Sequence, residues 1–272
     1  MKPLIKIRIV TMTLICLAFI KPSEGFNEPN DRPKQEEKRP NIILLVAEDM
    51  SHRIGSYGDE VARTPNIDRL AQSGQIFTNV FTTAGVCAPS RAALITGQHQ
   101  ISMGAQHMRS STSPHGKYFA LPSEEVKAFP EILRAKGYFT FTDRKLDYQF
   151  SGIYSGTGPF TIWDVEGEDH LAWRQRKPGQ PFFGLINFSE THESGLMRHD
   201  GVIHSESHRQ TIAFRRKANL NGDRITDPKL VNLEPYYPDL TELRTDIAQH
   251  YNNIHKMDKR VGMILKLSLI HI

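Results

Sequence analysis

The hydrophobic positions of the chain fall into short continuous runs that alternate with segments of helical periodicity. Residues 41–47 and 181–188 are runs of apolar residues, many of them β-branched or aromatic. Such runs are typical of strands buried on both faces of a parallel sheet. We expect 41–47 to be the first central strand, and the apolar stretches 75–81 and 138–142 to form two further strands.

Other segments carry helix start and stop signals. Residues 64–74 begin with a Thr cap, continue with Pro at the first helical position and end at Gly. The same signals predict helices at 89–96 and 129–136. Over residues 240–264, apolar side chains recur every three or four positions. This spacing predicts a long helix with one face packed on the sheet.

The order of these elements predicts an α/β fold, with a doubly wound, mostly parallel sheet flanked by helices. Two segments, 143–180 and 193–236, are rich in Gly, Ser, His and Arg and show little periodicity. Loops of this length in a compact domain usually line a site or mark disorder.

The first 40 residues are expected to lie outside the fold. Residues 1–25 combine a basic start, an apolar stretch and small residues at the expected cleavage position, which predicts a secretory signal peptide. The apolar stretch is shorter than the roughly 20 residues that span a bilayer. We therefore expect a secreted or periplasmic protein with no stable membrane span after cleavage; an uncleaved anchor is the alternative. The polar composition of residues 26–40 predicts a linker.

Length, charge and cysteine content exclude several classes of function. With 272 residues, the chain has room for one large domain or two small ones. The net charge is +4, but eight basic and five acidic residues lie in the first 40, which leaves a nearly balanced remainder. This balance excludes the positive field of a nucleic-acid-binding domain. Two cysteines, Cys16 and Cys87, are too few for a disulfide scaffold or a Cys-rich zinc site.

The most informative segment begins at Cys87 and reads Cys-Ala-Pro-Ser-Arg-Ala-Ala-Leu-Ile-Thr-Gly. Cys87 is expected just before a helix that starts with Pro, where backbone N–H groups and the helix dipole favour an anion. Arg91 follows one turn later on the same face. The geometry alone therefore predicts a nucleophile that handles anions.

This segment resembles the signature of the sulfatase family, Cys-x-Pro-Ser-Arg followed by Leu-x-Thr-Gly, and every fixed position is present. The resemblance extends over about 39–266 and includes Glu48-Asp49, the segment 64–68 and Thr191-His192. The details of 97–100 and 163–165 are most like the bacterial branch related to heparan N-sulfatases.

The resemblance implies that a dedicated maturation enzyme oxidises Cys87 to Cα-formylglycine. One hydroxyl of the hydrated aldehyde attacks sulfur and expels the alcohol or amine. The other then loses its proton and ejects sulfate. The implied reaction removes sulfate from a sulfated carbohydrate.

The resemblance also assigns roles to acidic and basic residues. Glu48 and Asp49, with the modified Cys87, would hold Ca²⁺, with Mg²⁺ as the less favoured ion. Family members usually carry two aspartates here, and Glu48 is one methylene longer. Arg91 would hold the formylglycine hydroxyls, and Lys145 would contact the same group and the sulfate.

Two histidines complete the predicted site. His192 matches a family histidine near the leaving group and is a natural proton donor. His107 is the best candidate for a substrate contact among the histidines that follow the signature. Many sulfatases place a histidine where this chain has Asp147, so that donor is missing here.

The family's second acidic cluster and a further lysine are expected after the long helix, and neither is found. We therefore interpret 41–266 as a C-terminally truncated sulfatase N-terminal catalytic domain that is inactive alone. Residues 267–272 break the amphipathic pattern, and we interpret them as an artefactual tail; a natural short tail is the alternative.

Other functions stay open at this point. Relatives with the same signature hydrolyse phosphodiesters or phosphonate monoesters, and a chain with lost ligands would be a non-catalytic glycan-binding pseudoenzyme. Each residue also has a structural alternative. Glu48-Asp49 would be a solvated loop start, Lys145 part of a solvent-facing charge run, His192 a strand-end histidine and Cys87 an inert thiol.

Overall fold

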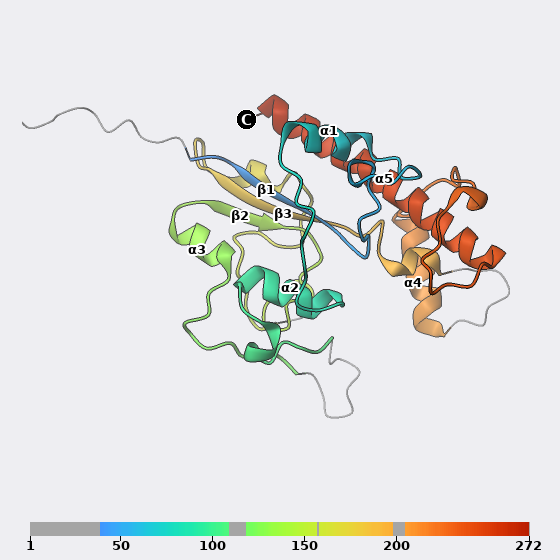
Figure 1. Ribbon diagram of the computed structural model, residues 1–272. Coiled ribbons are helices and arrows are strands. Elements are labelled where there is room, and N and C mark those ends of the chain that lie inside the picture. The colour runs from blue at the N-terminus through green and yellow to red at the C-terminus, as the bar shows by residue number, and fades with distance from the viewer. Residues whose placement is uncertain (1–38, 109–117, 157, 198–204, 272) are drawn as a thin grey trace, which may run out of the picture. The chain divides into compact units, whose positions relative to one another are not determined.

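The computed structural model describes residues 39–108, 118–156, 158–197 and 205–271, with side chains up to 267 (Figure 1). The predicted signal peptide and nearly all of the predicted linker lie outside these residues. No helix in the described ranges is both long enough and apolar enough to cross a membrane.

The described sheet has three parallel strands: β1 (Ile42–Ala47), β2 (Phe139–Thr142) and β3 (Phe182–Phe188). Their order is β1-β3-β2. The strand predictions at 41–47, 138–142 and 181–188 are confirmed. β3 rather than β1 is central in the described sheet, however. β1 lies at its edge with its side chains only partly buried, so the prediction of a central first strand is wrong for the described residues.

The described residues form five α-helices: α1 (Pro65–Ser73), α2 (Cys87–Thr96), α3 (Phe129–Ala135), α4 (Glu206–Lys217) and α5 (Thr241–His271). Helices α1 and α5 lie on one side of the sheet, and α2 and α3 lie on the other (Figure 1). Helices on both faces of a parallel sheet are the arrangement expected from the sequence. Short 3₁₀ turns connect the elements, at Gly55–Tyr57, Gln100–Met103, Ala172–Gln175, Glu193–Leu196 and Pro228–Leu230.

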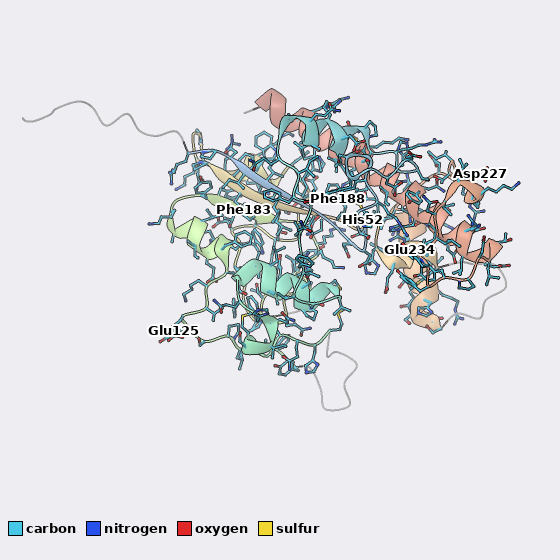
Figure 2. All side chains as sticks on the ribbon, in the orientation of Figure 1. His52, Glu125, Phe183, Phe188, Asp227 and Glu234 are labelled. Atoms are coloured by element: carbon cyan, nitrogen blue, oxygen red, sulfur yellow. The ribbon has the colours of Figure 1, made fainter. Side chains whose placement is uncertain are left out.

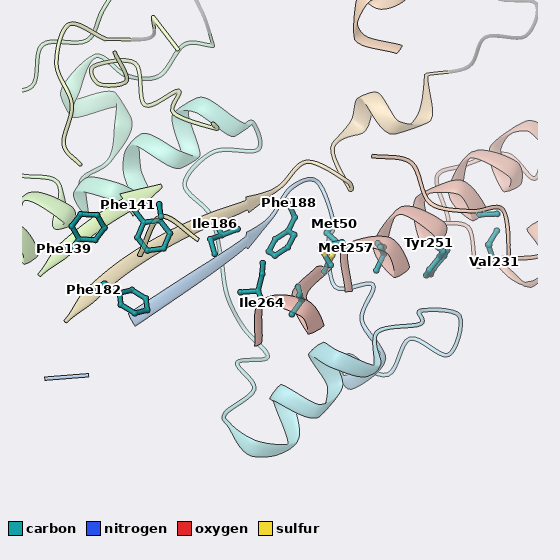
Figure 3. Close-up of a cluster of buried hydrophobic side chains, with 14 residues drawn as sticks. Met50, Phe139, Phe141, Phe182, Ile186, Phe188, Val231, Tyr251, Met257 and Ile264 are labelled. Atoms are coloured by element: carbon teal, nitrogen blue, oxygen red, sulfur yellow. The ribbon is translucent and has the colours of Figure 1, made fainter. Parts of the chain in front are cut away.

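The central strand β3 supplies side chains to both hydrophobic cores because successive residues point to opposite faces. Phe182, Ile186 and Phe188 belong to the cluster that also contains the apolar side chains of α5 (Figure 3). Phe183 and Leu185 join the cluster under α2 and α3; Phe183 and Phe188 are both labelled in Figure 2. Burial of such side chains stabilises the fold by roughly 1.5–3 kcal/mol each.

A glycine in the middle of β3 has a packing reason. A Cβ atom built on Gly184 would meet the ring of Phe141 at 2.4 Å. Phe141 comes from the neighbouring strand β2 and is almost completely buried. Gly184 therefore makes room for this ring in the core.

Helix α1 is held by the long helix α5 rather than by its own cap. The hydroxyl of Thr64 does not cap α1 but accepts a hydrogen bond from Gly55 N at 2.9 Å. The buried carboxylate of Asp258 on α5 accepts from Asn66 N at 3.1 Å and Ile67 N at 2.9 Å. The predicted Thr cap is therefore replaced by a carboxylate distant in sequence, which also satisfies N–H groups at the helix start.

Three further segments differ from the sequence predictions. Residues 75–81 form no strand, and the described residues offer them no ladder partner. Helix α4 lies within 193–236, where low periodicity predicted a loop. Helix α5 continues through the predicted break at 267 to His271.

Candidate active site

The site forms where the strands end, at their carboxyl edge. Glu48 follows β1 directly, and its side chain lies in a mostly buried position, 7% exposed. Its Oε2 lies 2.5 Å from Lys145 Nζ and 3.8 Å from His192 Nε2. Ser189 Oγ lies 3.4 Å from Oε1. The structure thus brings together Glu48, Lys145 and His192, which sequence analysis singled out separately.

Asp49 is exposed and its backbone is in the left-handed region, with φ 45°. This conformation is uncommon for a residue with a side chain, although Asp tolerates it better than most. Asp49 Oδ2 accepts a hydrogen bond from Glu193 N at 2.9 Å. The loop after β1 is therefore tied to the loop after β3, beside His192.

Cys87 is the first residue of α2, whereas the sequence predicted it just before the helix. Its thiol is free and half-buried, and Sγ lies 3.9 Å from Met108 Sδ. Cys87 therefore stands at a helix N-terminus, the position that favours an anion. The start of the helix therefore moves to Cys87, and the nucleophilic role of this residue stays a prediction.

Arg91 points into the protein from the next turn of α2 and is only 6% exposed. Its Nη1 donates to Asn187 Oδ1 at 2.6 Å. Nη2 donates to the carbonyl of Lys145 and, at 3.3 Å, to the hydroxyl of Tyr148. The buried Nε has no hydrogen-bond partner among the described residues. Arg91 is thus held by its two terminal nitrogens and keeps one donor for another group.

Asp143 is a site residue that sequence analysis did not identify. It follows β2, and its two oxygens accept from Asn187 N at 2.7 Å and Asn187 Nδ2 at 2.5 Å. Burial raises the pKa of Asp143, while the hydrogen bonds from Asn187 and the positive charge of Arg91 oppose this rise. A polar Asn near the carboxyl end of an otherwise apolar buried strand was the signal that could have found this network.

Lys145 joins two parts of the site. Its carbonyl oxygen accepts from Arg91, while its ammonium group reaches Glu48. The charge-run alternative is wrong for Lys145, because the side chain is largely buried, with 14% exposed, and forms an ion pair. One loop residue therefore contacts both the Arg91 group and the acidic group.

His192 is oriented by its own loop. Its Nδ1 accepts from Ser194 N at 3.2 Å, so a neutral ring carries its proton on Nε2. Nε2 faces Glu48. The ring therefore presents its N–H to the site rather than to the loop.

His107 lies at the exposed margin of the site. Its ring packs edge-on to Tyr118, with centroids 6.1 Å apart. Its chain neighbour Met108 contacts Cys87. This position is near the cysteine, but a substrate contact by His107 stays a prediction.

The predicted metal ligands fit only part of a calcium shell. Ca²⁺ takes six to eight oxygen ligands. Glu48 and Asp49 supply two carboxylates, but no group of three or more His, Cys, Asp or Glu within the described ranges is arranged to hold a metal ion. The described residues therefore do not make a complete calcium site.

Comparisons with known proteins agree with the motif. Residues 40–163 match the family model described as Sulfatase. The chain is 38% identical over 248 residues to an ulvan-active sulfatase of Formosa agariphila, which covers 84% of this chain and 40% of that protein. It is 28% identical over 247 residues to human N-sulphoglucosamine sulphohydrolase, which covers 83% of this chain and 46% of that protein.

The chain therefore spans less than half the length of these two relatives. A crystal structure from Bacteroides fragilis described as a sulfatase superposes with a TM-score of 0.55 at 19% identity, and it covers 85% of this chain and 59% of that one. This likeness supports the fold. Taken with the signature at Cys87 and the residues assembled around it, the comparisons show that the chain belongs to the sulfatase family.

Proposed function

We propose that the whole protein is a sulfatase that removes sulfate from a sulfated carbohydrate, with Cα-formylglycine made from Cys87 as its nucleophile. One observation carries the proposal. Cys87 and Arg91 lie one turn apart at the start of α2, and Lys145 connects Arg91 to Glu48. Arg91, Lys145 and Glu48 are thus connected by contacts, and the proposal adds the thiol of Cys87 from the preceding turn of α2 to this group.

The hydrated aldehyde supplies an oxygen nucleophile and a second hydroxyl whose deprotonation releases sulfate. The chain's own residues bind and orient. A sulfate ester gains negative charge on its sulfonyl oxygens in the transition state, and fixed donors stabilise that charge. Arg91 supplies a fixed positive charge, and the Lys145 ammonium lies within the same site.

The leaving alcohol or amine needs a proton. His192 presents Nε2–H to the site and is held in that orientation by Ser194. The proton donor is the imidazolium form of the ring, in which Nδ1–H can donate to Ser194 Oγ at 2.9 Å and the proton on Nε2 is transferred to the leaving group. We therefore assign proton donation to His192 Nε2.

Glu48 and Asp49 would contribute carboxylates to a Ca²⁺ ion, with Mg²⁺ as the less favoured alternative. When bound, the ion supplies positive charge beside the nucleophile. Its further ligands would come from outside the described residues. The Lys145 ammonium now neutralises the carboxylate of Glu48, as a cation at this position would.

The substrate class follows from chemistry and from the relatives. Their names specify ulvan in one case and N-sulphated glucosamine in the other. We propose a sulfated sugar as the substrate, a formylglycine-generating enzyme as a partner during maturation, and a secreted or periplasmic location. A nucleic-acid partner is not proposed, because the part of the chain after residue 40 has almost balanced charge.

The test uses the polypeptide encoded by the complete gene, produced together with a formylglycine-generating enzyme. Mass spectrometry of the Cys87 peptide should show the loss of sulfur and gain of oxygen. Sulfate release from sulfated oligosaccharides should be measurable by ion chromatography, and Cys87→Ala should reduce it to background, because the nucleophile is then absent. Ile101→Ala is the control, since this side chain is 71% exposed.

Three results would contradict the proposal. Full turnover by Cys87→Ala would exclude the formylglycine mechanism. A strong preference for an aryl phosphodiester over an aryl sulfate would instead support a phosphodiesterase of the same superfamily. An unmodified thiol together with glycan binding and no turnover would support a pseudoenzyme.

A further inference from the structure

We propose that Asp143 is a positioning residue of this site: it fixes the side-chain amide of Asn187 with its oxygen towards Arg91, and so holds the guanidinium in place. The inference rests on the proposed function, because it assigns Arg91 a role in binding the reacting group. It adds two residues, Asp143 and Asn187, that lie outside the sulfatase signature.

The hydrogen-bond chemistry leaves one orientation for the amide. An ionised carboxylate only accepts hydrogen bonds, and a side-chain amide has one donating and one accepting end. Both Asp143 oxygens receive N–H groups of Asn187, at 2.5 Å from Nδ2 and 2.7 Å from the backbone. The amide oxygen is therefore directed away from Asp143 and meets Arg91 Nη1 at 2.6 Å.

The reverse orientation is excluded by repulsion at both ends. It would place the amide oxygen against the carboxylate and the NH₂ group against the guanidinium. Asn187 and Arg91 are 2% and 6% exposed, so solvent offers little compensation for such contacts. Asp143 thus determines which end of the amide Arg91 meets.

The fixed amide matters because a guanidinium on a long side chain has many rotamers. Three groups converge on its terminal nitrogens: Asn187 Oδ1, the Lys145 carbonyl and the Tyr148 hydroxyl. The Tyr148 ring also lies against it, with 5.1 Å from Cζ to the centroid. A preorganised donor needs no reorientation as charge develops in the transition state.

A purely structural role would predict a different pattern of effects. Asp143 also ties the loop after β2 to β3 through the backbone of Asn187. A structural tie alone would be kept by any acceptor at 143. The positioning role additionally requires that residue 143 accepts a hydrogen bond from the side-chain NH₂ group of Asn187, so that the amide oxygen faces Arg91.

The exchange of the two side chains separates these roles. In Asp143→Asn, the new amide oxygen still accepts from the backbone of 187, but its NH₂ group faces Asn187 Nδ2. Asn187 must then rotate and turn its NH₂ group towards Arg91. In Asn187→Asp, two carboxylates meet at the distance of a hydrogen bond. The double variant Asp143→Asn with Asn187→Asp restores a donor–acceptor pair and presents an oxygen to Arg91.

The control is Asp164→Asn. Like Asp143, Asp164 accepts from the backbone of a strand, here Thr140 N of β2 at 2.8 Å, and it pairs with Arg134 at 2.9 Å outside the site. It therefore reports the loss of a carboxylate that holds a strand of the same sheet. We expect no effect of Asp164→Asn on kcat beyond about twofold, since surface substitutions away from such sites have small effects.

Two measurements on the complete, matured protein test the proposal. For sulfate-ester hydrolysis, each single exchange should lower kcat by about 10- to 100-fold, the range for residues that orient direct ligands, with a smaller change in KM. The double exchange should recover most of the loss. Formylglycine content is measured in each variant, so that poor maturation is not counted as lost kcat.

The second measurement does not depend on activity. The Nη signals of Arg91 in ¹⁵N-resolved NMR spectra should be separate in the native protein and in the double variant, because the held guanidinium rotates slowly. In the single variants they should average. A native protein that releases no sulfate would overturn the proposed function, while the NMR result would still decide the positioning role.

The outcomes are distinct. If Asp143→Asn folds and keeps both kcat and the separate Arg91 signals, the proposal is overturned. It is also overturned if the double variant folds with native stability and recovers neither property. If Asp143→Asn does not fold, Asn187→Ala carries the test, since it keeps the backbone bond to Asp143. Unchanged kcat and Arg91 signals in Asn187→Ala would then overturn the proposal.

Discussion

At the scale of single residues, the candidate site contains largely buried charged side chains whose charges compensate one another. Glu48 lies beside Lys145 and His192. Removing one member of a buried ion pair leaves an uncompensated charge, which costs more than the pair itself contributes. The stability of the site therefore depends on both partners being present together.

A first prediction concerns this pair. Lys145→Met should lower the free energy of unfolding by about 3 kcal/mol, because Glu48 loses its ammonium partner. Urea unfolding measures the change. The double variant with Glu48→Gln should recover part of it, and Lys127→Met, at an exposed position, should stay within about 0.5 kcal/mol. Equal effects of Lys145→Met and Lys127→Met would disprove a stabilising role for the ion pair.

A second prediction concerns His250 on α5, which is 6% exposed. Burial, together with the positive charge of Arg53, lowers its pKa from 6.5 to about 4. The unfolded chain therefore binds a proton at this ring between pH 6.5 and 4, whereas the folded protein does not. The stability that His250 contributes is present above pH 6.5 and is lost as pH falls towards 4, by roughly 3 kcal/mol in total.

His250→Gln removes this titration. The difference in unfolding free energy between the native protein and His250→Gln should therefore shift by that amount between pH 7 and pH 4. Comparing the two proteins cancels the contributions of other groups, such as Asp143. The exposed His99→Gln variant is the control. A difference that is independent of pH would mean that folding does not lower the pKa of His250.

At the scale of elements, the segment that begins at Thr64 illustrates how one motif serves several contacts. Asp68 accepts from Ser56 N at 2.8 Å, and Asn66 contacts Asp258 on α5. The sequence signals at 64–68 were correctly interpreted as a helix start. The partners that fix that start lie far along the chain, and local patterns carry no information about them.

A third prediction tests this anchoring. Asp258→Ala removes the acceptor for Asn66 N and Ile67 N, which leaves two N–H groups at the part-buried start of α1 without this partner. We expect a loss of about 2 kcal/mol in unfolding free energy and faster hydrogen exchange in α1 than in α3. Met263→Ala on the same helix, at a position 59% exposed, controls for helix propensity. Uniform exchange rates across both helices would argue against local anchoring.

The elements also show where sequence reasoning succeeds. Apolar runs and Pro or Gly signals located β1, β2, β3 and most helices, because burial and backbone geometry act locally. The segment 75–81 has the same apolar character but forms no strand, since strand formation needs a neighbour. Helix α4 was missed because its exposed faces are polar and leave a weak hydrophobic period.

At the scale of the whole molecule, apolar surface is distributed unevenly. The two cores around β3 are well buried, whereas Phe77, Val80 and Phe81 are 65%, 75% and 88% exposed. Contiguous exposed apolar side chains mark surfaces that associate with something else or promote aggregation. The segment 75–81 therefore differs from the cores in the exposure of its side chains, although its composition is similar.

A fourth prediction compares two phenylalanines in these environments. Phe141→Ala should cost about 3–5 kcal/mol, since Phe141 is 1% exposed in the core. Phe81→Ala should change stability by less than about 0.5 kcal/mol and should reduce binding of an apolar dye. Thermal unfolding and dye fluorescence measure the two effects. A large loss of stability in Phe81→Ala would mean that this ring is buried in the native protein.

The site as a whole was predictable only in part. The signature identified Cys87 and Arg91, because their chemistry needs fixed spacing on one helix. The approach of Lys145 and His192 to Glu48 depends on loops after three different strands, and only the fold brings these together. The contact between Asp143 and Asn187 was not predicted, because the partners lie 44 positions apart and no local pattern relates them.

Lys145 contacts Arg91 through its backbone carbonyl and Glu48 through its side chain. The position of both groups therefore depends on this one residue. A substitution that shifts the main chain at 143–147 moves both halves at once. Substitutions in this loop should therefore be tolerated only together with compensating substitutions near residues 48 and 91. The effects of mutations in these three places should be strongly epistatic.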